Sequence, residues 1–142
     1  MIKKTITYED YNGTERVEDF YFNLSKAELT EMELSTEGGY ASMLNKIINS
    51  KSLPDLMAEA KKLILKAYGE KSTDGRRFVK SEELSLAFSQ TEAYSQLFTQ
   101  FISDADMASK FVNGVMPAEL QKDIEEIMAK EASEPNSDLS LA

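Results

Sequence analysis

The stretch "TITYEDYNGTERVEDFYFNLSKAEL", residues 5–29, decides the fold of the N-terminal part of the chain. It places Asn12-Gly13 between two segments rich in β-branched and aromatic residues, the residue types that favour strands. Asn-Gly is the preferred pair for a two-residue hairpin loop, because both positions need a positive φ. The stretch therefore predicts an antiparallel β-hairpin.

The register of this hairpin determines which side chains are buried. A two-residue loop places Ile6 opposite Asp19 and puts Phe20 on the face opposite Ile6. One extra residue near Glu18-Asp19, a β-bulge, would gather the apolar side chains of both strands on one face: Ile6, Tyr8, Val17, Phe20 and Phe22. Tyr21 then points outward and is a candidate for contact with a partner. The alternative is that the aromatic run serves only the packing of the strand against a helix.

Helix signals dominate the rest of the chain. Ser25 with Glu28 three residues later forms a capping box that opens a helix running to about Ser35, before Gly38-Gly39. Five further helices are expected from apolar residues at helical spacing and from their end signals: from Tyr40, from Ser52-Pro54 to Gly69, from Ser81 to Phe88, from Thr91 to Ile102, and from Asp104 to Asn113-Gly114. The segment between Gly69 and Ser81 predicts a loop or a short hairpin. We therefore expect a mostly helical α+β fold, in which an N-terminal β-hairpin packs on about five or six helices and a further strand remains open.

The charge is unevenly distributed along the chain. The net charge is −9, and residues 117–142 contain seven acids and two lysines. The first 116 residues contain 18 acids and 14 bases and are close to balanced. We therefore expect one globular domain over residues 1–116, followed by an acidic tail over residues 117–142. The tail could contain a short amphipathic helix, and its small, polar end predicts disorder.

Composition and motifs argue against most enzyme classes. The chain has neither Cys nor His, which removes thiolate zinc sites, Cys nucleophiles and His-based acid–base catalysis. It has no glycine-rich phosphate loop, and Asp104 and Asp106 are explained better by helix capping than by a calcium loop. The negative charge argues against general nucleic-acid binding, and no apolar run is long enough to span a membrane. We expect no catalytic residue, metal site or cofactor.

Two further features could contact a partner. Lys71, Arg76, Arg77 and Lys80 form a basic cluster that could hold an acidic segment, such as the tail of this chain or of a neighbouring copy. The alternative is a solvated loop balanced by nearby acids. In the tail, the apolar stripe of Leu120, Ile124, Ile127 and Met128 could dock in a groove, fold back on the domain, or fray. The predicted partner-binding residues are Tyr21, Arg76, Arg77, Leu120, Ile124 and Ile127.

Four phrases of the chain, taken in order, resemble a known family. They are "KKTITYEDYNGTERVEDFYFNLSKAELTEMEL", "EGG", "LKAYGEKSTDGRRFVKSEELSLAFSQTEAYSQLF" and "FVNGVMP", and they span roughly residues 1–117. In this order they resemble the tail assembly chaperones of long-tailed siphophages. The resemblance rests on the order of the phrases and offers no catalytic residue to carry over. The family's usual fold is largely helical, whereas this chain begins with a predicted hairpin.

The resemblance implies a non-enzymatic function in the cytoplasm of the host cell. Members of this family bind the tape measure protein, keep it soluble and help the major tail protein to polymerise around it, without entering the virion. A longer form is often made by a programmed frameshift near the 3′ end. The implied partners are thus the tape measure protein and the major tail protein, with a homo-oligomer left open. The alternative is a minor structural tail or connector protein that stays in the virion.

Overall fold

The computed structural model describes residues 1–115, except for the side chain of Ile48. The predicted tail, its disorder and its stripe of Leu120, Ile124 and Ile127 therefore lie outside the described residues. The described elements are β1 (Ile2–Glu9), β2 (Glu15–Phe22), α1 (Lys26–Ser35), α2 (Tyr40–Ser50), α3 (Leu53–Ala67), β3 (Tyr68–Lys71), β4 (Phe78–Val79), α4 (Glu82–Ser89), α5 (Glu92–Ser103) and α6 (Ala105–Val115). The predicted mostly helical α+β fold is confirmed.

The hairpin is present, but its extra residue lies in the loop and not at Glu18-Asp19. The Gly13 N–H donates to the Asp10 carbonyl and the Asp10 N–H donates to the Thr14 carbonyl, so the loop contains three residues. Gly13 has a φ of +81°, the left-handed conformation that this loop requires. The strands then pair without a bulge, and Ile6 lies opposite Glu18. The predicted bulge is wrong. The register does differ by one residue from that of a two-residue loop, but the third loop residue causes this change.

This register separates the apolar side chains of the hairpin. Directly paired residues share a face, so Ile2 and Phe22 lie on the same side as Ile6 and Phe20. Val17 pairs with Thr7 on the other face and is 65% exposed, which corrects its predicted burial. Val17 was assigned to the core only because the bulge was placed before Phe20.

A second hairpin extends the sheet to four antiparallel strands in the order β1-β2-β3-β4. Tyr68 pairs with Phe22 and Gly69 pairs with Tyr21, while Lys71 pairs with Phe78. The third helix therefore ends at Ala67, and Gly69 belongs to a strand rather than terminating the helix. The possible further strand is therefore present as β3, and it pairs with a fourth strand, β4.

The predicted helix starts are found at their capping residues. The Ser25 hydroxyl accepts from the Glu28 N–H, and the Glu28 carboxylate accepts from the Ser25 N–H, which completes the capping box. Ser81 and Thr91 cap α4 and α5 through their side chains. By contrast, Gly114 does not end the last helix. It lies within α6, where a Cβ would come within 2.5 Å of the Ile2 side chain.

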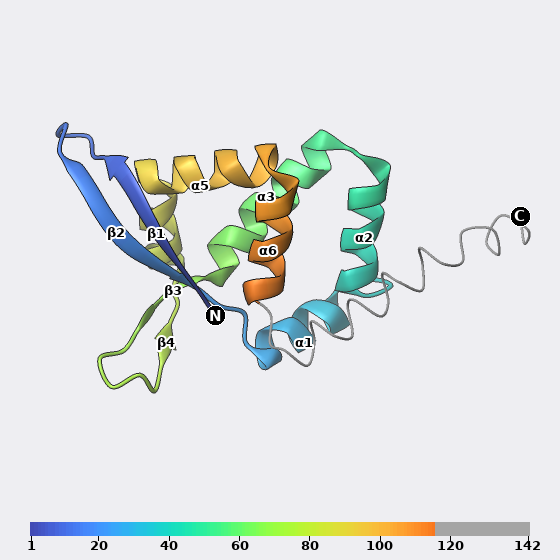
Figure 1. Ribbon diagram of the computed structural model, residues 1–142. Coiled ribbons are helices and arrows are strands. Elements are labelled where there is room, and N and C mark those ends of the chain that lie inside the picture. The colour runs from blue at the N-terminus through green and yellow to red at the C-terminus, as the bar shows by residue number, and fades with distance from the viewer. Residues whose placement is uncertain (116–142) are drawn as a thin grey trace, which may run out of the picture.

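The core lies between the inner face of the sheet and the helices. Figure 1 shows the strands along one side of the molecule, with α4 and α5 next to them and α2 on the far side. Six large side chains are fully buried here: Phe22, Leu24, Ile64, Leu97, Phe111 and Val115. The Tyr68 and Phe88 rings stack with centroids 4.2 Å apart, and Phe22 meets the edge of Phe111. Aromatic packing thus joins the sheet to α4 and α6.

Candidate binding surfaces

The outer face of the sheet carries aromatic and basic side chains. Tyr21 lies on this face, as predicted, because it alternates along β2 with Phe20 and Phe22, which face the core. Its paired residues on the neighbouring strands are Lys3 and Gly69. The Lys71 ammonium lies 4.6 Å from the centroid of the Tyr21 ring, a cation–π contact. Phe78 shares the face and covers Gly69, where a Cβ would come within 2.6 Å of its ring. The structure thus brings Tyr21 into contact with one member of the predicted basic cluster.

Arg76 and Arg77 lie in the loop between β3 and β4. Their backbone N–H groups donate to the Asp74 carboxylate and the Ser72 hydroxyl, both at 3.0 Å. Within residues 1–115, neither guanidinium makes an ion pair, and both arginines are exposed. The hydrogen bonds from Ser72 and Arg76 hold the pKa of Asp74 below its usual range. The loop is therefore shaped by its backbone and by Asp74, which leaves the two arginine side chains available.

Lys80, the fourth predicted member of the basic cluster, has a structural role. Its ammonium donates to the Asn23 carbonyl at 2.6 Å and to both carboxylate oxygens of Glu28 at 2.7 and 2.8 Å. Burial lowers the pKa of Lys80, and the Glu28 carboxylate offsets part of that effect. The other three members of the cluster share this region with two aromatic side chains. We call the five residues the basic hairpin face: Lys71, Arg76, Arg77, Tyr21 and Phe78.

A second surface lies where α2 turns into α3. The apolar stripe of α3 is buried over its C-terminal part, where Ala60 and Leu63 belong to the core. At helical spacing the same stripe continues towards the N-terminus through Leu56 and Met57 to Leu53. Leu53 is 60% exposed and Met57 is 41% exposed. The stripe therefore extends beyond the core that it helps to form.

We call Leu53, Leu56 and Met57 the apolar corner. Sequence periodicity places Leu56 and Met57 on the apolar stripe that contains Ala60 and Leu63, but periodicity cannot show where the core ends. One signal in the sequence could have indicated this exposure. The apolar stripe of α3 is longer than the neighbouring helix α2, so α2 alone cannot cover it.

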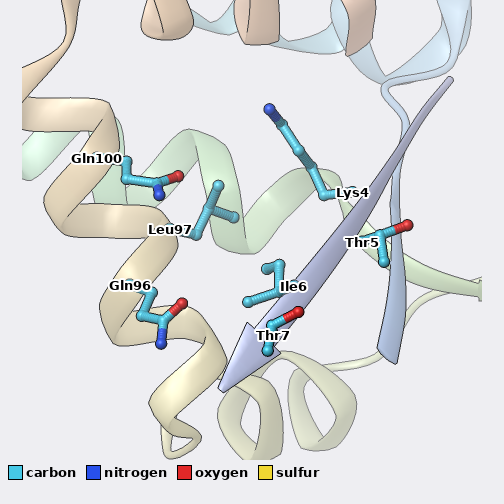
Figure 2. Close-up of a pocket in the computed structure, with 7 residues that line it drawn as sticks. All are labelled: Lys4, Thr5, Ile6, Thr7, Gln96, Leu97 and Gln100. Atoms are coloured by element: carbon cyan, nitrogen blue, oxygen red, sulfur yellow. The ribbon is translucent and has the colours of Figure 1, made fainter. Parts of the chain in front are cut away.

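A hollow of about 260 Å³ lies between the edge strand β1 and α5. Figure 2 shows Gln96 and Gln100 extending from α5 towards β1, with Ile6 and Leu97 closing the space between them. Lys4 is the only ionisable residue in the lining. The seven labelled lining residues contain no carboxylate, so they offer no pair of carboxylates for acid–base chemistry.

Within residues 1–115, no group of three or more Asp or Glu side chains converges in a way that could hold a metal ion. No helix of that part is both long and apolar enough to cross a membrane.

Comparison with protein families gives one finding that spans the molecule. A family model described as phage tail assembly chaperone matches residues 1–141. Comparison with curated proteins gave no match, and neither did comparison with solved structures. The matched range includes both surfaces and the acidic segment that follows α6.

Proposed function

The chain belongs to the family of phage tail assembly chaperones, and on that premise we propose that it binds the tape measure protein in the host cytoplasm. In this role it keeps the tape measure protein soluble and promotes assembly of the tail tube by the major tail protein. The role requires no catalysis. It requires a surface that covers apolar helical faces before the tube encloses them.

The apolar corner is the observation that carries this proposal. Leu53, Leu56 and Met57 occupy positions i, i+3 and i+4 of α3, so their side chains form one patch on one helix face. A patch of this kind packs against an apolar stripe on another helix. Met57 is unbranched and flexible, which suits a surface that must fit successive, non-identical segments of a long partner.

Aggregation of the tape measure protein provides the test. A tape measure fragment is diluted from denaturant with and without this chain, and turbidity is followed with time. We expect the wild-type chain to suppress the rise in turbidity. The double variant Leu53→Glu/Met57→Glu is expected to lose this effect, because it places two charges on the contact surface. Equal suppression by the wild type and the variant would remove the apolar corner from the proposal.

The alternative is a minor tail or connector protein that stays in the virion. Mass spectrometry of purified particles separates the two functions, because a chaperone leaves the assembly. We expect this chain to be depleted from particles relative to the infected-cell lysate. A fixed copy number per particle would favour the structural alternative.

A further inference from the structure

The basic hairpin face contains cations without a carboxylate partner inside the described domain. Arg76, Arg77 and Lys71 form no ion pair within residues 1–115, although the chain as a whole has a net charge of −9. Within the loop, Asp74 Oδ1 accepts hydrogen bonds from the Ser72 hydroxyl and the Arg76 N–H. Three cations therefore remain for a negative group from outside the described domain.

The same face provides aromatic surface beside those cations. Tyr21 lies under the Lys71 ammonium, and Phe78 is paired with Lys71 across the hairpin. Guanidinium groups bind carboxylates through two parallel hydrogen bonds, and aromatic rings pack the apolar atoms between successive acids. The face thus suits an acidic polypeptide segment with apolar residues among its acids.

The segment that follows α6 has this chemistry and begins close by. Residues 117–142 contain seven acids and two lysines. The Val115 carbonyl accepts a hydrogen bond of 2.9 Å from the Leu24 N–H, two residues after Phe22. Phe22 pairs with Tyr68 at the end of the sheet where β3 begins, next to the pair of Tyr21 and Gly69. The last described residue therefore lies beside Leu24, just beyond the end of the strand that carries Tyr21.

We propose that the acidic segment 117–142 docks on the basic hairpin face of its own molecule through ion pairs with Lys71, Arg76 and Arg77. An extended chain covers about 3.3 Å per residue, so the segment 117–142 is long enough to reach the hairpin. Tethering also gives an effective concentration in roughly the millimolar range, which favours the segment of the same molecule over that of a neighbour. The docked segment covers Tyr21 and competes with any acidic partner for the face. The contact forms within one molecule and does not require the tape measure protein.

A single spin label tests the contact in the full chain. The sequence contains no cysteine, so Ser133→Cys provides one attachment site within the acidic segment. We expect the label to broaden the amide signals of Tyr21 and of the β3–β4 loop, and to leave those of α2, on the far side of the molecule, sharp (Figure 1). The broadening should disappear at high salt, since exposed ion pairs are screened. It should also disappear in the Arg76→Glu/Arg77→Glu variant and persist in Lys110→Glu, which alters an exposed cation on α6.

A mixing experiment shows whether the docked segment comes from the same molecule or from a neighbouring copy. Spin-labelled chain without isotope is added to isotope-labelled chain without a spin label, and we expect no broadening in the mixture. Broadening in the mixture would assign the docked segment to a neighbouring copy and overturn the intramolecular contact. Broadening that is absent from the hairpin, or that falls on another face, would overturn the proposal altogether. Unchanged chemical shifts of the α2 amides, recorded without a spin label, show that the variants remain folded.

Discussion

The Lys80 ammonium and the Glu28 carboxylate form a two-pronged ion pair, with Nζ 2.7 and 2.8 Å from the two carboxylate oxygens. The same carboxylate accepts from the Ser25 N–H and completes the capping box of α1. Lys80 follows β4 directly, so the pair joins the second hairpin to the first helix across 52 residues of sequence. It also fixes the end of the hairpin on which Arg76 and Arg77 are displayed.

Replacement of Lys80 by Ala should destabilise the domain by about 1–3 kcal/mol, because it leaves the half-buried Glu28 carboxylate without its charged donor. Lys110→Ala is the matched control. The Lys110–Asp106 pair is almost fully exposed, so its loss should change the free energy of unfolding by less than about 0.5 kcal/mol. Urea unfolding of both variants gives the comparison, and equal losses would show that the Lys80 contact is not specific.

The pH dependence of stability should reveal the charge on Glu28. Burial alone would raise the pKa of Glu28, but hydrogen bonds from Lys80 and from the Ser25 N–H outweigh it and lower the pKa below the usual value. A lowered pKa in the folded state means that the stabilisation is present above the unfolded pKa of about 4.3. It is lost as the pH falls through the lower folded value.

Glu28→Gln should therefore be less stable than the wild type at pH 7, and the difference should shrink below about pH 4. The Asp10 and Asp74 carboxyls also have lowered pKa values. They are the same in both proteins, so the difference between the two melting temperatures reports on Glu28. A difference that stays constant from pH 7 to pH 3 would contradict this account.

Gly114→Ala should destabilise the domain even though alanine favours helices. An added Cβ would come within 2.5 Å of the Ile2 side chain, and overpacking of this kind costs about 1–3 kcal/mol. Ile2→Ala removes the obstructing atoms, so Gly114→Ala should cost much less in that background. Additive losses in the double-mutant cycle would show that the two residues are not in contact.

The sequence identified most helices correctly because their signals are local. The capping box of Ser25 and Glu28 and the caps at Ser81 and Thr91 depend on residues three positions apart. The hairpin loop was also signalled locally. Asp10 followed three residues later by Gly13 is typical of a type I turn that closes on a glycine, and the preference for Asn-Gly concealed it.

The other misassignments depend on contacts between distant residues. Tyr68 continues the periodicity of α3, and only its pairing with Phe22 makes it the start of a strand. Asn113-Gly114 is a pair typical of a helix end. In the structure, however, Gly114 lies inside the helix, where the lack of a side chain leaves room for Ile2 from the opposite end of the chain. The exposed part of the apolar corner was likewise not predictable, because the extent of the core depends on how all the helices pack.

Removal of residues 118–142 should leave the domain folded, since residues 1–115 form a core with six fully buried large side chains. We expect the melting temperature of the truncated chain to lie within a few degrees of the wild-type value, because exposed ion pairs contribute little. Differential scanning calorimetry provides the measurement. A loss of tens of degrees would show that the segment belongs to the core.

The apolar corner should tolerate charge without loss of stability. Leu53 and Met57 are exposed, so Leu53→Glu/Met57→Glu should change the free energy of unfolding by less than about 1 kcal/mol. Leu86→Glu is the matched control, because Leu86 on α4 is equally exposed and lies outside the corner. Circular dichroism melts of both variants should overlay that of the wild type, and a large loss in the double variant alone would identify the corner as part of the core.

Co-expression with the tape measure protein of the same phage tests the central claim most directly. Light scattering on the soluble fraction measures whether the two chains co-elute and in what ratio. We predict a soluble complex with many copies of this chain per tape measure protein, formed by the wild type and by Leu86→Glu but not by Leu53→Glu/Met57→Glu. A tape measure protein that stays insoluble while the wild-type chain elutes alone would contradict the account.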